Sequence, residues 1–331
     1  MRAVRCVDPG GPRPLRVDEV AEPVPGPGEV LVEVHAAGVN FPDVLLVQGR
    51  YQRKPDVPFI PGGELAGIVL RLGPEVEGDL RVGDRVFAAG RYGAWAEYAC
   101  VPARKLSRVP DHRTTTAAAA FPITYNTSYH ALKDRAHLLA GQTLLVLGAG
   151  GGVGISAVEL GRAMGARVLA VASTPEKRQA AAEHGAAVTF EADPGGLRDA
   201  IRRATEGAGV DVVYDPVGGS LSEPAFRSLA WDGRFLVIGF ASGTIPAIPL
   251  NLPLLKGAAL AGVFWGEWAE RHPDAADANR QELLALWARG ALDPAVSRTF
   301  PFTSAAQALD ELESRRAVGK LVLTMPAAAA V

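Results

Sequence analysis

The feature that most constrains this chain is an apolar run that breaks into glycines and then resumes with helical spacing. Residues Thr143 to Leu147 are almost wholly apolar, and Gly148-Ala149-Gly150-Gly151-Gly152-Val153-Gly154 follows directly. The run predicts a strand buried on both faces, and the glycines let the backbone turn sharply and approach a ligand. Apolar residues from Ile155 to Met164 then continue as a helix whose first N–H groups point back at the turn. The pattern predicts a turn that binds a pyrophosphate.

Aligned with the fingerprint of dinucleotide-binding turns, the glycines give the frame Ala149-x-Gly151-x-x-Gly154, with alanine in place of the usual first glycine. A glycine-rich linker is the alternative interpretation. The strand before the glycines and the amphipathic helix after them favour the binding turn, because a linker has no such flanks.

The sequence divides into two parts that differ in composition and in the pattern of apolar residues, and the glycine motif lies in the second. Residues 1–120 are rich in Pro and Gly, with short apolar strands such as 29–37, 64–72 and 84–88, which predicts an antiparallel, barrel-like catalytic domain. Residues 121–266 alternate strand and helix, which predicts a doubly wound parallel sheet of the Rossmann type. The expected strands are 143–147, 167–172, 187–190, 210–214, 234–239 and 258–264. We expect residues 267–331, a long helix and further strands, to return to the first half.

Composition limits the function classes. A chain of 331 residues exceeds the size of a single core, so two domains are expected. With 34 basic and 36 acidic side chains the formal charge is −2, which gives no case for nucleic acid as the main partner. A long uncharged run, 235–255, contains three prolines, so we expect no membrane span. We expect no secretion signal, and two distant cysteines fit a reducing compartment, so a cytoplasmic protein is expected.

The cofactor is predicted from the end of the second parallel strand. A site for NAD has an Asp or Glu there to bind the ribose hydroxyls, but this strand ends Val171-Ala172-Ser173. Lys177 and Arg178 follow in the next helical turn and suit a 2′-phosphate, which predicts NADPH. Alternatively, the two are solvated charges. Ser173 to Glu176 also reads as a capping box with serine at the N-cap, which would occupy Glu176 and leave it unable to bind the ribose.

Five motifs in order carry a resemblance to a known family: Val39-Asn40-Phe41-Pro42-Asp43, Pro61 to Gly67, Gly83 to Val86, Gly148 to Gly154, and Gly319-Lys320. Nearly the whole chain resembles the medium-chain dehydrogenase/reductase superfamily, and within it the zinc-free quinone oxidoreductase branch that includes the zeta-crystallins. The resemblance implies a GroES-like antiparallel β-barrel catalytic domain plus a Rossmann domain. It also implies a homodimer that pairs through the last parallel strand, residues 258–264.

The metal ligands of the zinc-dependent relatives are missing. Where those relatives have a cysteine and a histidine, this chain has Asn40 and Gly63, and the four-cysteine structural lobe is absent. Asparagine is a poor zinc ligand and glycine has no side chain, so we expect no metal. Hydride transfer without a Lewis acid suits an acceptor that spreads the incoming charge, such as a quinone or an α,β-unsaturated carbonyl.

Candidate catalytic residues are the Asn40 amide and the Tyr51 hydroxyl, as hydrogen-bond donors to the substrate. For Asn40 the alternative is a helix N-cap before Pro42 and Asp43, and Tyr51 could instead cover the nicotinamide. The remaining sites concern cofactor binding. They are Phe41, Thr127, Gly150, Gly151, Gly152, Val153, Ser173, Lys177, Arg178, Gly239, Phe240, Ala241, Ser242, Phe264, Trp265 and Lys320. Arg178 follows from the charge argument above, most of the others are implied by the resemblance, and for Phe41, Phe264 and Trp265 the alternative is a place in the core. Ala192 stands where relatives often have an aromatic residue or histidine, which leaves NADPH selectivity to Lys177 and Arg178.

The expected function is an NADPH-dependent reductase of quinones or enones. An enoyl-thioester reductase is the second interpretation, because the basic run Arg50 to Lys54 could hold the arm of coenzyme A or a carrier protein. A nucleotide-binding, crystallin-like protein with little activity is the third.

Overall fold

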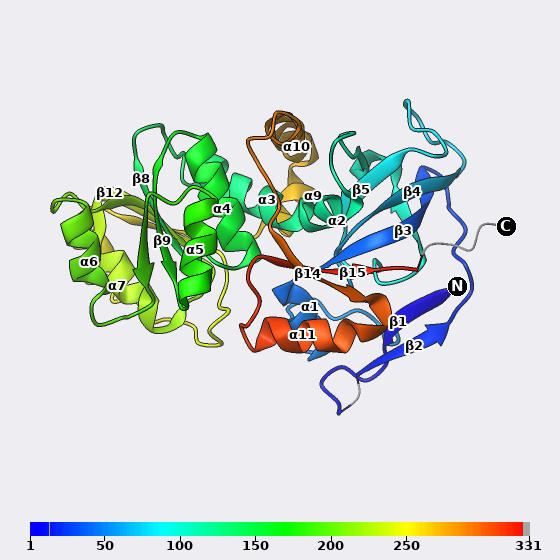
Figure 1. Cartoon of the computed structure of the whole chain (residues 1–331), viewed down its shortest axis with the longest axis horizontal. Helices are drawn as coiled ribbons and strands as arrows, with labels where there is room; N and C mark the ends of the chain where they lie inside the picture. The colour runs from blue at the N-terminus through cyan, green and yellow to red at the C-terminus, as the bar shows by residue number, and fades with distance from the viewer. Residues whose placement is uncertain (13, 327–331) are drawn as a thin grey trace. The chain divides into compact units, whose positions relative to one another are not determined.

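The computed structural model describes residues 1–12 and 14–326, which form two compact units (Figure 1). Of these described residues, the first unit contains those up to 123 and those from 294 to 326, and the second contains residues 124–293. The last strands of the chain therefore complete the first unit. The expected division differs for residues 267–293, which lie in the second unit rather than with the N-terminal half.

The first unit is built on a seven-stranded sheet with the order β14-β15-β3-β4-β5-β7, in which β6 also pairs with β3. Neighbouring strands are antiparallel except for β14 and β15, which are parallel. A separate two-stranded sheet joins β1 and β2. The bounds are β1 (Arg2–Cys6), β2 (Leu15–Glu19), β3 (Glu29–Val39), β4 (Glu64–Leu72), β5 (Arg85–Ala89), β6 (Tyr98–Pro102), β7 (Ser107–Arg108), β14 (Val296–Pro301) and β15 (Lys320–Thr324).

Strand β3 organises the first unit, because it pairs with β4, β6 and β15. Its sequence is rich in valine and alanine, and most of its side chains are buried in the core that surrounds Trp95. Three short helices accompany the sheet, α1 (Phe41–Val47), α2 (Thr115–Ala120) and α11 (Ala305–Glu313), with 3₁₀ turns at Ala103–Lys105 and Phe302–Ser304. Helix α1 starts directly after β3, so the residue between them, Asn40, has a fixed position at the end of a buried strand.

The second unit contains the six-stranded parallel sheet, with the order β10-β9-β8-β11-β12-β13. The bounds are β8 (Thr143–Leu147), β9 (Arg167–Ala172), β10 (Val188–Glu191), β11 (Val210–Asp215), β12 (Leu229–Val237) and β13 (Ala259–Gly262). The order reverses between β8 and β11, so this is the topological switch point where open α/β sheets bind ligands. The predicted fold class, an antiparallel unit and a doubly wound unit, is confirmed. The last strand is shorter than expected: it contains only Ala259–Gly262, and the next helix begins soon after it, at Trp265.

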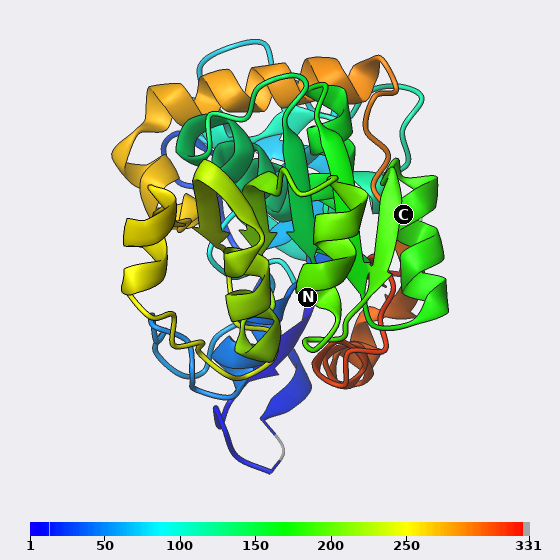
Figure 2. The ribbon, with the colours of Figure 1, turned by 90° about the vertical axis from the view of Figure 1, so that its left-hand side faces the viewer.

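Helices cover both faces of this sheet (Figures 1 and 2). Helices α4 and α5 lie against one face, and α6 and α7 lie against the other. The bounds are α3 (Pro122–Tyr129), a π-helix (His130–Arg135), α4 (Gly152–Ala163), α5 (Pro175–Glu183), α6 (Leu197–Ala204), a 3₁₀ turn (Gly219–Leu221), α7 (Ser222–Arg227), α8 (Asn251–Lys256), α9 (Trp265–Arg271) and α10 (Pro273–Ala288).

Polar and aromatic contacts explain why α9 and α10 belong to the second unit. The ring of Trp268 on α9 stacks on His130, with 4.0 Å between the ring centroids. Glu282 on α10 accepts hydrogen bonds from the Tyr129 hydroxyl and from Lys133 Nζ. These partners lie in α3 and the π-helix. The spacing of apolar residues in the sequence does not predict such contacts.

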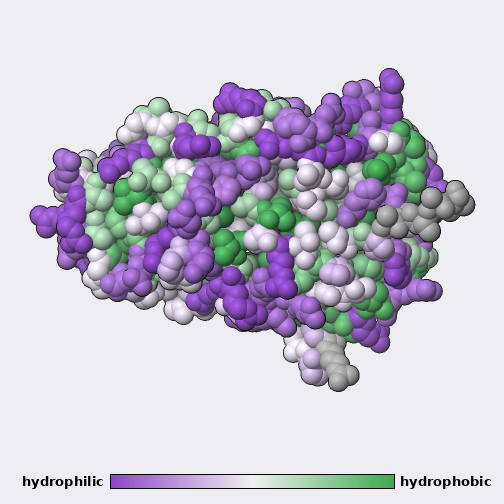
Figure 3. Space-filling model, viewed as in Figure 1, coloured by the Kyte–Doolittle hydropathy of each residue, from purple (hydrophilic) through white to green (hydrophobic). Residues whose placement is uncertain are grey.

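The described part of the chain contains no helix that is both long and apolar enough to cross a membrane. On the face drawn in Figure 3, hydrophilic side chains are interspersed with smaller groups of hydrophobic ones. The large aliphatic and aromatic side chains are instead mostly buried in the cores of the two units.

Candidate functional site

The glycine turn follows β8 and is shaped by close approaches that exclude side chains. Gly148 has a left-handed φ of +61°, and a Cβ there would lie 2.6 Å from Val217 Cγ2. A Cβ on Gly154 would lie 2.2 Å from the carbonyl oxygen of Gly148. Helix α4 then begins with Gly151 as a side-chain-free N-cap. Because Gly150, Gly151 and Gly152 have no side chains, the main-chain amides at the start of α4 can approach a ligand closely, and the turn fits an anionic diphosphate.

Lys177 lies against this turn. An added Cβ on Gly150 would lie 2.4 Å from Lys177 Cβ and 2.7 Å from its Cγ, so the stem of the lysine packs directly on the glycine. Arg178 Nη1 donates to the carbonyl oxygen of Ala172, the last residue of β9, at 3.3 Å. The structure thus brings both predicted cations to the end of β9, where Ser173 is exposed and no carboxylate ends the strand.

The cap of helix α5 differs by one residue from the predicted capping box. Thr174, not Ser173, is the N-cap, and its hydroxyl oxygen accepts from the Lys177 N–H. Pro175 takes the first helical position, N1, which proline favours. Glu176 is therefore at N2, one residue before the N3 position that a capping box requires. Hydrogen bonds from its own N–H and from the Thr174 hydroxyl lower the pKa of the exposed Glu176. As expected, the Glu176 carboxylate is engaged in hydrogen bonds at the start of α5, although the N-cap is one residue later than predicted.

The loops after β8, β11 and β12 lie side by side at the carboxyl edge of the parallel sheet. Val217, after β11, fills the space beside Gly148, and the N–H of Ser242, after β12, donates to the Val217 carbonyl at 2.8 Å. The structure therefore brings the predicted segment Gly239, Phe240, Ala241 and Ser242 to the same edge as the glycine turn. Phe264 and Trp265 follow β13, with Phe264 about half exposed.

Asp215 is a residue that the sequence analysis missed. It ends β11, is 2 % exposed, and accepts from the Val217 N–H, the Gly218 N–H and the Ser222 hydroxyl at 2.6–2.8 Å. Burial raises its pKa, and these hydrogen bonds oppose the rise. Asp215 thereby fixes the loop that closes over Gly148. A lone Asp after an apolar strand is the only sequence signal for this role.

Thr127 lies on α3, which is joined to the first turn of α4. The hydroxyl of the adjacent Ser128 contacts the Ser156 hydroxyl, the Tyr214 hydroxyl and the Val153 carbonyl at 2.8–3.2 Å. Thr127 itself is half-buried. These contacts hold α3 beside the part of α4 that carries Gly152 and Val153.

In the first unit, Asn40, Glu64 and Lys320 form a buried polar cluster. Lys320 Nζ lies 2.6 Å from Glu64 Oε1 and 2.7 Å from Asn40 Oδ1, and Asn40 Nδ2 donates to Glu64 Oε1 at 2.8 Å. The three residues are 1–7 % exposed. Asn40 holds the N-cap position of α1 in a capping box with Asp43, as the alternative interpretation expected, and its side-chain amide also belongs to this cluster. Lys320 was expected at the cofactor, whereas its ammonium is enclosed within the first unit.

Asp43 and Tyr51 lie close to this cluster. Asp43 Oδ2 accepts from the main-chain N–H of Asn40 at 2.8 Å. Burial raises the pKa of Asp43 to about 7, although hydrogen bonds from Asn40 and Gly62 and the charge of Lys320 oppose the rise. Burial also raises the pKa of the Tyr51 phenol, which keeps it a hydrogen-bond donor. Phe41, predicted at the cofactor, is half-buried and packs against the core of the first unit.

Gly63 holds the position where the resemblance expects a zinc ligand in metal-dependent relatives, and it has no side chain. A Cβ on Gly63 would lie 3.0 Å from Ile123 Cδ1 and 3.4 Å from the Gly90 carbonyl oxygen. Among residues 1–12 and 14–326, no three His, Cys, Asp or Glu side chains are grouped to hold a metal ion. Asn40 and Gly63 therefore supply neither a thiolate nor an imidazole at these two positions.

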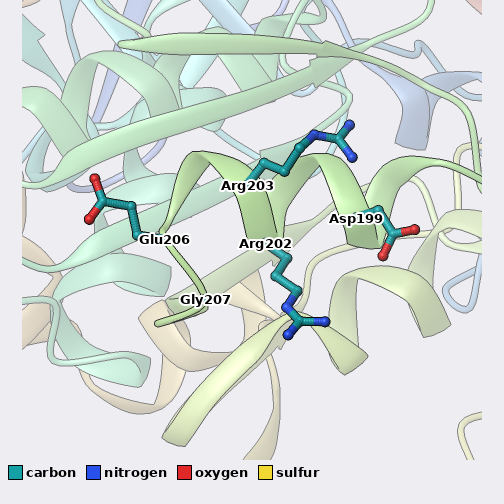
Figure 4. A pocket seen from close by; sticks show the side chains of 5 residues that line it. All are labelled: Asp199, Arg202, Arg203, Glu206 and Gly207. Carbon is teal, nitrogen blue, oxygen red and sulfur yellow. The ribbon is translucent and has the colours of Figure 1, made fainter.

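A surface depression elsewhere on the second unit is lined by Asp199, Arg202, Arg203, Glu206 and Gly207 (Figure 4). All of them come from α6 and the residues that follow it. Their side chains point in different directions along an exposed helix, so they do not converge on a ligand.

Comparisons with known proteins agree with this geometry. Residues 26–111 match the model of the alcohol dehydrogenase GroES-like domain, and residues 152–279 match that of the zinc-binding dehydrogenases. Quinone oxidoreductase-like protein 2 of Mus musculus is 35 % identical over 316 residues, 95 % of this chain and 89 % of the relative. Quinone oxidoreductase of Homo sapiens is 30 % identical over 98 % of each chain.

A solved mycobacterial structure complexed with NADPH superimposes with a TM-score of 0.89 at 33 % identity, covering 98 % of this chain and 99 % of the other. The family model that matches from residue 152 onward carries zinc in its name, although Asn40 and Gly63 replace the ligands expected of zinc-dependent members. The two family models, the relatives and the two-unit fold together confirm the predicted family: the chain belongs to the medium-chain dehydrogenase/reductase superfamily of oxidoreductases, in its quinone oxidoreductase branch.

Proposed function

We propose that this protein is an NADPH-dependent reductase that transfers hydride to quinones or α,β-unsaturated carbonyl compounds without a metal. One observation carries the proposal: a turn of bare main-chain amides lies against Lys177, with Arg178 at the end of β9 and no carboxylate there. The amides suit the diphosphate and the cations suit a 2′-phosphate. The resemblance to quinone oxidoreductases and to a mycobacterial NADPH complex supports the same assignment.

The binding roles follow from the elements that carry each residue. Gly150, Gly152 and Val153 would bind the diphosphate through their N–H groups. Gly151, whose N–H donates to the Gly148 carbonyl, would line the same turn without a side chain. Ser173, Lys177 and Arg178 would bind the 2′-phosphate. Thr127, the segment Gly239 to Ser242, Phe264 and Trp265 would border the ribose and nicotinamide, and Phe41 is proposed as a further cofactor contact. Lys320 is left out of this set, because its N–H groups are occupied within the first unit.

The chemistry needs donors for the acceptor oxygen. The bound nicotinamide supplies the hydride, and the oxygen of a quinone or enone gains negative charge as the hydride arrives. We assign the stabilising hydrogen bonds to the Asn40 amide, which does not titrate, and to the Tyr51 hydroxyl, whose raised pKa keeps it a donor at neutral pH. A conjugated acceptor spreads the charge over several atoms, so hydrogen bonds suffice where a simple ketone would need a Lewis acid.

An acceptor screen tests this function. Purified protein is mixed with NADPH or NADH and with simple quinones, enones or crotonyl thioesters, and oxidation is followed at the nicotinamide absorbance band. We expect turnover of quinones or enones with NADPH, unchanged by a chelator. Loss of activity on chelation would refute the metal-free chemistry, and a preference for NADH would refute the cofactor assignment.

An enoyl-thioester reductase is the second candidate, favoured by the basic run Arg50 to Lys54, in which Arg50 and Lys54 are exposed. Such a run would attract the phosphates of a coenzyme A or carrier-protein arm. The crotonyl thioester in the screen separates the two: faster turnover of the thioester than of any quinone would establish this candidate. Binding of NADPH without reduction of any acceptor would instead favour a crystallin-like protein.

We also propose that the protein is a cytoplasmic homodimer. Strand β13 ends the parallel sheet, so its outer edge is open for pairing with a second copy. Large exposed apolar side chains lie on β13 itself, at Leu260, on the neighbouring β12, at Trp231, and on α8 and its N-cap, at Leu250, Leu254 and Leu255. Cys6 and Cys100 are free thiols, which fits a reducing compartment.

A further inference from the structure

We infer that Lys320 and Glu64 are positioning residues that orient and polarise the Asn40 amide, so that its one free N–H donates to the carbonyl oxygen of the acceptor. The inference rests on the reductase function proposed above and adds two residues that do not touch the substrate. It also gives the C-terminal strand β15 a part in the reaction, because Lys320 is its first residue.

The ammonium of Lys320 has no donor left for a ligand. Its Nζ donates to the Glu64 carboxylate at 2.6 Å, to Asn40 Oδ1 at 2.7 Å and to the Val39 carbonyl at 3.1 Å. An ammonium has three N–H groups, so these three bonds use all of them. Lys320 can therefore act on a substrate only through a neighbour.

The carboxylate of Glu64 is equally committed. Its Oε1 accepts from Asn40 Nδ2 and from Lys320 Nζ, and its Oε2 accepts from the main-chain N–H of Ile123 at 2.8 Å. Gly38 makes room for this carboxylate, since a Cβ there would lie 2.1 Å from Glu64 Oε1. Glu64 thus sits in a niche that fixes both of its oxygens.

These two charges allow only one orientation of the Asn40 amide. An ammonium can only donate and a carboxylate can only accept, so Oδ1 must face Lys320 and Nδ2 must face Glu64. A flipped amide would oppose oxygen to carboxylate and NH₂ to ammonium. Because the three side chains are almost inaccessible to solvent, water could not replace the lost hydrogen bonds, and either mismatch would leave buried polar groups without a partner.

One hydrogen of Asn40 Nδ2 bonds to Glu64, and no group of the described residues accepts the other. The ammonium at Oδ1 draws electron density from the amide nitrogen, which strengthens this remaining donor. The cluster therefore ends in one oriented, polarised N–H of the kind that stabilises a developing oxyanion.

A double-mutant cycle on kcat tests the inference. Asn40→Ala removes the donor and should lower kcat for a simple quinone by about a hundredfold, as for other oxyanion donors. Lys320→Met removes the polarising charge and should lower kcat by roughly tenfold. In the double variant we expect no further loss beyond that of Asn40→Ala, because Lys320 acts through Asn40. The Kd for NADPH, measured by fluorescence, should stay within about twofold of the wild-type value.

Leu321→Ala is the matched control. Leu321 is the next residue of β15, is 1 % exposed, and points to the opposite face of the strand. This variant should lower the melting temperature while kcat stays near the wild-type value. If Lys320→Met fails to fold, Lys320→Gln, which keeps an N–H donor without the charge, enters the same cycle.

The outcomes separate this inference from the proposed function. A wild type that reduces no acceptor would refute both. An active wild type in which the losses of Asn40→Ala and Lys320→Met multiply, or in which Lys320→Met leaves kcat unchanged, would refute the positioning role alone.

Discussion

His184 Nδ1 and Glu159 Oε1 lie 2.6 Å apart in the second unit, and the carboxylate of this pair is buried. Glu159 Oε2 also accepts from the Tyr125 hydroxyl and from the main-chain N–H of Asp293. One carboxylate on α4 therefore ties together α3, the end of α5 and the segment after α10. Since α4 begins at the glycine turn, the pair helps to hold the helix that would bind the diphosphate.

This pair predicts a pH-dependent stability. The hydrogen bond to Glu159 raises the pKa of His184 above 6.5, against the effect of burial, and the charges of Asp293 and Glu183 add to the rise. A group whose pKa is raised in the folded state stabilises fully below its unfolded pKa and loses that contribution as pH rises. We expect the melting temperature to fall as pH increases from 6 through the raised pKa.

Replacing the imidazole isolates its contribution. His184→Gln keeps a donor for Glu159 but does not titrate, so its melting temperature should vary less between pH 6 and 9. Asp43, with a pKa of about 7, gives a trend of the same sign in both proteins, so the informative quantity is the difference between the two curves. Parallel curves would contradict this prediction.

The glycine turn predicts unequal costs for two alanine substitutions. In Gly154→Ala the new Cβ would lie 2.2 Å from the Gly148 carbonyl oxygen and 2.7 Å from Ala149 Cα, both main-chain atoms that cannot rotate away. We expect a loss of about 3 kcal/mol or more in the free energy of unfolding, as for severe overpacking. Urea unfolding at neutral pH measures it.

Gly151→Ala is the matched control in the same turn. Its Cβ would meet nothing closer than 3.6 Å, and its φ of −93° suits any residue. Only the weaker capping preference of alanine remains, at about 1 kcal/mol or less. Equal losses in the two variants would mean that the close approach at Gly154 is not what stabilises the turn.

The sequence was most informative where one local signal determines the structure. The turn after Leu147 and the six parallel strands follow from apolar runs and glycines, and the structure contains them all. The cap of α5 was placed one residue early, because Ser173 and Thr174 are both good caps and only the backbone decides between them. Propensity alone carries no information on such a choice.

Contacts between residues far apart in the chain could not be predicted from the sequence. Lys320 and Glu64 are 256 residues apart, and nothing near Lys320 in the chain indicates that its ammonium is enclosed with Asn40. Helix α10 was expected in the first unit, yet Glu282 bonds to Tyr129 and Lys133. Such polar contacts depend on which elements pack together, so no pattern within one segment reveals them.

The two cations at the end of β9 predict the cofactor preference. Lys177→Ala and Arg178→Ala should each reduce kcat/KM for NADPH by about tenfold, the value of one charge-assisted hydrogen bond, and leave kcat/KM for NADH nearly unchanged. The initial rate is measured with each cofactor at saturating quinone. Equal reductions for both cofactors would indicate that these side chains support the fold of the turn rather than bind a 2′-phosphate.

The open edge of β13 predicts the last measurement. If two copies pair there, wild-type protein should show by light scattering a mass of twice 34.7 kDa. Leu260, within β13 and 41 % exposed, would then lie in the interface. Leu260→Glu should shift the population toward monomer, because a carboxylate would be buried with each copy.

Val82→Glu is the control for this substitution, since Val82 lies in the first unit and is 63 % exposed. The same charge there should leave the mass unchanged, as expected for an isolated surface site. A monomeric wild type would refute pairing through β13. A Leu260→Glu variant that stays dimeric would show that the interface lies on another surface, because a charge at the centre of a paired strand edge would lose its hydration in both copies.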